Sequence, residues 1–278
     1  MPPASKRTPP PPPAAPRADA SPSNEGAVAA FRTSPAGELR AAGTWLYTLA
    51  QPGVDPERQE KSHPHQALFD PTGAFVLVPD LGADAIRVFS AAGGALKPLA
   101  PIAVTPPGTG PRHGVFVARA GEQSYYYLVG ELANTVLTFR VRYARGTIVL
   151  TPVGSVSTLP RAGVPVSATP GAAEIQVSAC GRWVYVSNRG DAVHAGADTI
   201  AVFARNAHSG TLSPVDFFSG RVLGIRHFSI DPSGKWLVTE GQYSNNLAAF
   251  KLDAVTGKAQ AVPGLFNTTS PVCLTWAR

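Results

Sequence analysis

The chain has 278 residues, of which 44% are hydrophobic and 15% are charged, and it contains 27 glycines and 28 prolines. Such a chain can bury a large core, and so much glycine and proline indicates many turns rather than long helices. The formal net charge of +6 is spread thinly, without the basic runs and interleaved aromatics of a nucleic-acid groove. This argues against a nucleic-acid partner and favours a small anionic molecule.

Cys180 and Cys273 are far apart and lie in no CxxC spacing, so neither a disulfide framework nor a metal site is predicted. The glycines of "GTGPRHG" have the wrong spacing for a dinucleotide fingerprint, and no GxSxG or HExxH motif occurs, so no cofactor is expected. No run of 18 apolar residues exists, and the N-terminus lacks the apolar core of a signal peptide. We therefore expect a cytoplasmic protein without membrane contact.

Residues 1–26 include a run of five prolines and almost nothing that could enter a core. We expect a disordered tail with polyproline II character, followed by one folded domain over residues 27–278. A solvated tail is the simpler interpretation, and a ligand for an SH3 or WW domain is the alternative.

From residue 27 onward a pattern repeats: a short apolar stretch, a turn, and a second apolar stretch that ends in polar residues. The copies are "HQALFDPTGAFVLVPDLG", "RHGVFVARAGEQSYYYLVGEL", "AEIQVSACGRWVYVSNRGD" and "RHFSIDPSGKWLVTEGQYSN". The turns "DPTG" and "DPSG" suit a type I turn, so each copy predicts a β-hairpin. A third strand ending in an aromatic, such as "AIRVFS" or "TIAVFAR", follows each hairpin, and outer strands such as "GTLSPV" complete the unit.

Three or four strands recurring at intervals of roughly 45 to 60 residues predict an all-β fold of the β-propeller type. A β-sandwich is the alternative, but it does not explain why the strands repeat in the same order. We predict four complete blades, at about 63–105, 111–160, 172–220 and 224–263. "AVAAFRTSPAGELRA" before them and "PVCLTWAR" after them resemble strands of a further, composite blade. The aromatics at matching strand positions are expected in the core: Phe75, Tyr126, Trp183 and Trp236.

The hairpin geometry predicts where a site lies, because the start of the first strand lies beside the end of the second. Aligning the repeats on their turn glycines gives one column of His65, Arg112, Ala173 and Arg226, and a next column of Gln66, His113, Glu174 and His227. The opposing column holds Asp80, Glu131, Asn188 and Gly241, with Arg189 after Asn188. We therefore expect His65, Arg112, Arg226, Glu131 and Arg189 to face one volume at the mouth of the channel.

These residue types suit acid–base chemistry on an anionic substrate. Arginines bind phosphate or carboxylate and stabilise oxyanion charge, while a carboxylate and an imidazole move protons. The alternative is that Arg112 and Glu131 simply pair with neighbours and fasten one blade to the next.

At these residues the chain resembles the lactonase family of seven-bladed propellers, which includes bacterial-type 6-phosphogluconolactonases and fungal 3-carboxy-cis,cis-muconate cyclases. The matching segments are "HPHQALFDPTG", "PPGTGPRHGVF", "GEL", "VYVSNRG", "RHFSIDPSGKWL" and "PVCLTW", and they cover nearly everything after about residue 60. The resemblance implies that His65 and Glu131 transfer protons and that Arg112 and Arg189 bind an anionic lactone or carboxylate. From the repeat geometry we add Arg226 and His113 to the substrate-binding group.

The segment from "GPRHGVF" to "GEL" is more similar to the 6-phosphogluconolactonase branch, which implies hydrolysis of a sugar δ-lactone without a metal ion. Muconate cyclisation is the alternative. Family members have seven blades, whereas this sequence accounts for about five. We therefore expect either a truncated chain or a shortened ring. A noncatalytic interaction platform, with the proline-rich tail recruiting a partner, is a further alternative.

Overall fold

The computed structural model describes residues 25–100, 103–144, 146–160, 171–190 and 198–277. Its elements are β-strands and one short 3₁₀ turn, η1 (Ala92–Gly94). In the described part of the chain, no helix has the length and apolar character that a bilayer-spanning segment needs. The expected proline-rich tail falls almost wholly outside the described residues, so its disorder and its contact with an SH3 or WW domain stay predictions. Strand β1 already begins at Glu25.

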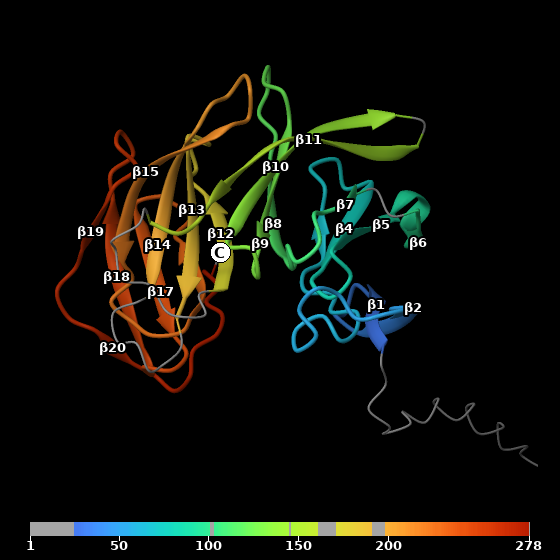
Figure 1. The fold of residues 1–278 in the computed structure, drawn as a ribbon, viewed down its shortest axis with the longest axis horizontal. Helices are drawn as coiled ribbons and strands as arrows, with labels where there is room; N and C mark the ends of the chain where they lie inside the picture. The colour runs from blue at the N-terminus through green and yellow to red at the C-terminus, as the bar shows by residue number, and fades with distance from the viewer. Residues whose placement is uncertain (1–24, 101–102, 145, 161–170, 191–197, 278) are drawn as a thin grey trace, which may run out of the picture.

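Strands β3 to β20 form four antiparallel sheets in chain order, and each of these sheets is one propeller blade (Figure 1). The first blade contains β3 (Leu68–Phe69), β4 (Phe75–Asp80), β5 (Ala85–Ser90), β6 (Lys97–Pro98) and β7 (Ala103–Val104). The second contains β8 (Pro111–Val117), β9 (Tyr125–Gly130), β10 (Thr135–Ala144) and β11 (Thr147–Ser157). The third contains β12 (Gly171–Val177), β13 (Trp183–Arg189), β14 (Thr199–Arg205) and β15 (Leu212–Ser219). The fourth contains β16 (Ile225–Ile230), β17 (Trp236–Gly241), β18 (Asn246–Leu252), β19 (Ala259–Ala261) and β20 (Phe266–Asn267).

The predicted blades and their hairpin turns are confirmed. In "DPTG" the Gly73 amide donates to the Asp70 carbonyl at 2.9 Å, and in "DPSG" Gly234 donates to Asp231 at 2.9 Å. Both glycines have a positive φ, near +70°, which any residue with a Cβ adopts at a cost. The fold is therefore an all-β propeller built from the repeat seen in the sequence.

The core lies between successive blades rather than within any one of them. Three apolar clusters separate the first and second, the second and third, and the third and fourth blades. The middle strands β4 and β9 are therefore buried on both faces. This is the face-to-face packing of a propeller, in which each blade needs its neighbours to remove its apolar surface from water.

Polar side chains also connect neighbouring blades. Tyr127 donates to the carbonyl of Gly210 at 2.9 Å, and Tyr185, one blade further on, donates to Gly257 at the same distance. Gln176 on β12 bonds two backbone groups of β16, the Phe228 carbonyl at 2.8 Å and the Ile230 amide at 2.9 Å. Because these bonds are directional, they fix how each of these blades is registered against the next.

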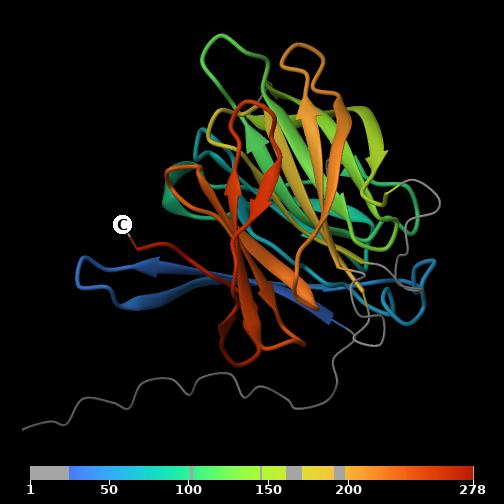
Figure 2. The ribbon, with the colours of Figure 1, turned by 90° about the vertical axis from the view of Figure 1, so that its left-hand side faces the viewer.

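The hairpin of β1 (Glu25–Thr33) and β2 (Leu39–Thr48) is a separate two-stranded sheet that packs on the first blade, and its tip extends past the other sheets (Figure 2). The expected composite blade does not form among the described residues, since β1 and β2 pair only with each other. The final segment "PVCLTWA" is not a strand. It contacts β16 through its side chains instead: Trp276 Nε1 donates to Ser229 Oγ at 2.8 Å.

The expected aromatic core is correct for Phe75 and Tyr126, which are buried, and Trp183 is partly buried. Trp236 is an exception at 41% exposed. Trp183 Nε1 donates to the Ala254 carbonyl of the next blade at 3.0 Å, whereas no described sheet lies beyond the fourth blade to cover Trp236.

Candidate functional site

The loop "TPPGTGPRH" presents Arg112 and His113 at the start of β8 because a buried carboxylate holds it. Asp84 accepts the backbone N–H groups of Gly108 at 2.7 Å and Gly110 at 2.8 Å. Both glycines have a positive φ, and a Cβ on Gly110 would lie 2.5 Å from Leu132. Only glycine fits there, so the sequence around Arg112 follows from the need to bring this loop against Asp84.

Asp198 does the same for the fourth blade. Its carboxylate accepts the backbone N–H groups of Gly224 and Ile225, directly before Arg226 and His227. The two Arg-His pairs are therefore placed by the same device, an aspartate that satisfies the amides of the turn before an innermost strand.

The Glu131 carboxylate is the centre of an arginine cluster. Arg112 Nε lies 2.8 Å from its Oε2, while Arg189 Nη2 and Arg58 Nη2 lie 2.8 Å and 2.5 Å from its Oε1. The side chains of Arg112 and Glu131 are 1% and 2% exposed. Arg112 Nη1 also donates to the Ala173 carbonyl on the neighbouring blade at 2.7 Å.

These contacts set the charges of the cluster. Burial alone would raise the pKa of Glu131, but Arg189 and Arg112 outweigh it and lower that pKa to about 2. Burial, followed by repulsion from Arg189, lowers the pKa of Arg112 to about 10. Glu131 and Arg112 are thus ionised at neutral pH, and Glu131 is a weak base for as long as the arginines surround it.

His65 lies next to this cluster, in the segment before β3. Burial, followed by the charges of Arg112 and His113, lowers its pKa to about 3. Its Nδ1 is buried without a hydrogen-bond partner among the described residues. His65 is therefore a neutral imidazole at neutral pH, facing a positive potential.

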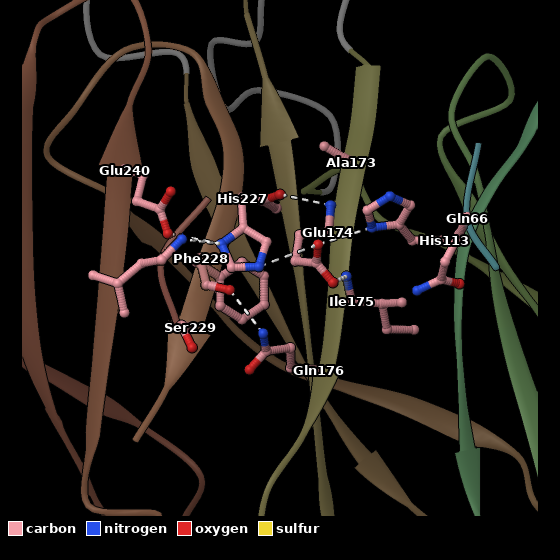
Figure 3. Close-up of polar contacts among 12 residues, drawn as sticks. Gln66, His113, Ala173, Glu174, Ile175, Gln176, His227, Phe228, Ser229 and Glu240 are labelled. Carbon is pink, nitrogen blue, oxygen red and sulfur yellow. Dashed lines mark hydrogen bonds and ion pairs between the residues drawn. The ribbon is translucent and has the colours of Figure 1, made fainter. Parts of the chain in front are cut away.

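A second group of titratable side chains comprises His113, Glu174, His227 and Glu240 (Figure 3). His113 Nδ1 lies 2.8 Å from Glu174 Oε2, His227 Nε2 lies 3.8 Å from the same oxygen, and His227 Nδ1 lies 2.7 Å from Glu240 Oε1. The rings of His65 and His113 are 5.0 Å apart and meet edge to face, so the two groups touch.

Arg226 forms no ion pair with any described residue. It lines an open cleft of about 440 Å³ together with His65, Arg58 and Lys61. An unpaired guanidinium at the wall of a cleft is available to a ligand, and phosphate or carboxylate is the ligand that it binds best.

Comparison with known proteins identifies the fold. Residues 21–276 match the family model described as lactonase, 7-bladed beta-propeller. The chain belongs to this lactonase family. A protein of Arthroderma benhamiae named "Probable 6-phosphogluconolactonase" is 43% identical over 249 residues, which are 89% of this chain and 62% of that protein. The 6-phosphogluconolactonase of Bacillus subtilis is 34% identical over 226 residues, which are 81% of this chain and 60% of that one.

A solved structure has a similar fold. The periplasmic gluconolactonase of Pseudomonas aeruginosa superposes with a TM-score of 0.72 at 29% identity, covering 90% of this chain and 66% of that one. This lactonase-family chain spans about 60% of the length of the two relatives named above.

The lactonase-family chain brings its expected site residues together: His65 is within electrostatic reach of Arg112, His113, Glu131 and Arg226, and Arg189 pairs with Glu131. Two other members of the expected columns are engaged elsewhere. Asp80 pairs with Arg87 at 2.7 Å, and Asn188 donates to the Thr158 carbonyl at 2.7 Å. Sequence reasoning missed Arg58, because it lies in an irregular segment outside the repeat.

Proposed function

We propose that this chain hydrolyses a sugar δ-lactone that carries an anionic group, as in 6-phosphoglucono-δ-lactone. The observation that carries the proposal is the cluster of guanidinium groups at this rim: Arg58, Arg112 and Arg189 contact Glu131, and Arg226 lines the neighbouring cleft. Such a site attracts a phosphate or carboxylate and stabilises the negative charge that develops on a lactone carbonyl. The names of the relatives point to lactone hydrolysis rather than to muconate cyclisation.

In the proposed reaction, Arg112, Arg189 and Arg226 bind the substrate, and Glu131 holds the first two in place. His65 and Glu131 are the expected proton-transfer groups. Burial and the nearby positive charges both lower the pKa of His65; a bound anion offsets the positive charges, so binding makes His65 a stronger base. Water attacks the carbonyl carbon, the oxyanion forms against an arginine, and the ring oxygen leaves as a hydroxyl group.

The test is acid release from freshly generated 6-phosphoglucono-δ-lactone, measured against spontaneous hydrolysis. We expect a rate above background for the chain and a loss of roughly 10²-fold in kcat/KM for Arg189→Ala. Arg142→Ala, which removes an exposed arginine of β10, is the matched control and should keep full activity. A folded chain with no rate above background would overturn the proposal.

A further inference from the structure

A row of acidic and basic side chains extends over three blades, and its two histidines directly follow Arg112 and Arg226 in the chain. It consists of His113 on β8, Glu174 on β12, and His227 and Glu240 on β16 and β17 (Figure 3). The first three occupy equivalent positions of successive innermost strands. The proposed roles of the arginines, His65 and Glu131 make no use of this row.

Glu174 is held rigidly in the row. Its side chain is 7% exposed, its Oε1 accepts the Ile175 amide at 3.0 Å, and its own amide donates to Ser187 Oγ at 3.0 Å. This leaves Oε2 directed at His113 Nδ1, 2.8 Å away. A carboxylate accepts hydrogen bonds, so Nδ1 of His113 is the donor in this contact, and when the ring is neutral its lone pair lies on Nε2.

The Nε2 atom of His113 is free to react. It lies on the far side of the ring from Glu174, toward the Ala173 end of the strands (Figure 3). The Ala173 carbonyl accepts the hydrogen bond of Arg112 Nη1. No described residue hydrogen-bonds Nε2 of His113, and this side chain is 18% exposed. The His65 ring, which lies next to the arginine cluster, is 5.0 Å from the His113 ring.

His227 and Glu240 lie on the side of Glu174 that is opposite to His113 (Figure 3). Both nitrogens of His227 face carboxylate oxygens: Nδ1 lies within hydrogen-bond distance of Glu240, while Nε2 lies at ion-pair distance, 3.8 Å, from Glu174. Burial would lower the pKa of His227, but the Glu240 hydrogen bond and the charges of Glu174 and Glu240 outweigh burial and the opposing charge of Arg112, and they raise it. The charges of His227 and Glu240 then compensate each other, and the Glu174 carboxylate remains the partner of His113.

We propose that His113 is a catalytic residue that carries the proton during lactone hydrolysis, and that Glu174 is its positioning residue. This inference rests on the proposed function. A carboxylate that fixes the tautomer and orientation of an imidazole is the arrangement that makes histidine an effective base at neutral pH. Glu131 and His65, with pKa values of about 2 and about 3, are weak bases before substrate arrives.

The proposed step balances. His113 Nε2 takes a proton from water as the water oxygen bonds to the carbonyl carbon. The tetrahedral oxyanion collapses, the bond between the carbonyl carbon and the ring oxygen breaks, and the Nε2 proton passes to that oxygen. The product is a hydroxy acid whose carboxyl proton leaves to solvent.

The kinetic test compares His113→Ala, Glu174→Gln and Glu174→Asp with the unchanged chain on 6-phosphoglucono-δ-lactone. We expect kcat to fall by ~10²–10⁴-fold in His113→Ala and on the order of 10²-fold in Glu174→Gln, while KM changes little. Added imidazole should restore part of the His113→Ala rate, and Glu174→Asp should retain more activity than Glu174→Gln. His208→Ala, at a surface turn, is the control. Full kcat in folded His113→Ala would overturn the proposal.

A second measurement separates this inference from the proposed function. In full-length chain labelled with ¹⁵N at histidine, the His113 shifts should report a proton on Nδ1 and a bare Nε2 at pH 7.5, and Glu174→Gln should weaken that preference. If no lactone is hydrolysed but this tautomer is found, the proposed function fails while the geometry of the pair stands. The opposite tautomer, or no response to Glu174→Gln, would contradict the role of Glu174 whatever the activity.

Discussion

Arg112 Nε lies 2.8 Å from Glu131 Oε2, and neither side chain is more than 2% exposed. The pair joins the start of β8 to the end of β9, and Arg112 continues to the Ala173 carbonyl of the next blade. Arg189 reaches the same carboxylate from the third blade. The arginines thus connect neighbouring blades, as the structural alternative expected, in addition to the substrate-binding role proposed for them.

Glu131→Gln should destabilise the fold as well as reduce activity. Removing one partner of a buried ion network leaves the other charges uncompensated, and the expected loss is about 3–5 kcal/mol in the free energy of unfolding. Urea unfolding measures it. Glu38→Gln, which breaks an exposed pair with Arg40, should change stability by less than about 0.5 kcal/mol. Equal effects from both variants would contradict the account of the cluster.

The Glu131 contribution should depend on pH. The pKa of this carboxyl falls from 4.5 to about 2 on folding, so its stabilisation is complete above pH 4.5 and is lost as the pH falls toward 2. The stability difference between the unchanged chain and Glu131→Gln should therefore narrow between pH 5 and pH 3. A constant difference over that range would show that the carboxylate charge is not its source.

His65 should make the chain less stable in mild acid. Its pKa is lowered from 6.5 to about 3, so the unfolded chain binds more protons in this window and stability falls as the pH drops below 6.5. The expected slope from this residue is about 1 kcal/mol per pH unit. His65→Gln should flatten the curve between pH 6.5 and 5, whereas His208→Gln should leave it as it is. His227 has a raised pKa and acts in the opposite direction, above pH 6.5.

Arg226→Ala should separate binding from folding. This guanidinium pairs with no described residue, so stability should change by no more than about 0.5 kcal/mol. Loss of one charge-assisted bond to substrate should raise KM by ~10- to 100-fold with little change in kcat. Steady-state kinetics with thermal unfolding checks both. An unchanged KM would remove Arg226 from the binding group.

Asp84→Asn tests the loop that places Arg112. The amide cannot accept from both Gly108 and Gly110 without turning its NH₂ toward one of them, and the expected cost is about 1–3 kcal/mol. Asp253→Asn is a matched control, since Asp253 also accepts two backbone N–H groups but in an exposed turn. Activity should fall in Asp84→Asn alone.

The sequence allowed the four blades to be predicted because their turns and strand periods repeat, and the alignment of the repeats brought Arg112, His113 and Glu131 to one rim. Contacts outside the repeat had no such signal. Arg58 reaches Glu131 from an irregular segment, and the end of the chain bonds side chains of β16 instead of extending a sheet. The alignment placed Glu174 in the column of His113, but its proposed positioning role depends on a 2.8 Å contact between blades, which an alignment does not reveal.

The central claim is that the arginines around Glu131 select an anionic lactone. The direct test is the ratio of kcat/KM for 6-phosphoglucono-δ-lactone to that for glucono-δ-lactone, in the unchanged chain and in Arg226→Ala. We expect a ratio of about 10²-fold in favour of the phosphorylated lactone, corresponding to about 3 kcal/mol of charge-assisted binding, and a marked decrease in Arg226→Ala. Equal rates on the two lactones in the unchanged chain would contradict the claim.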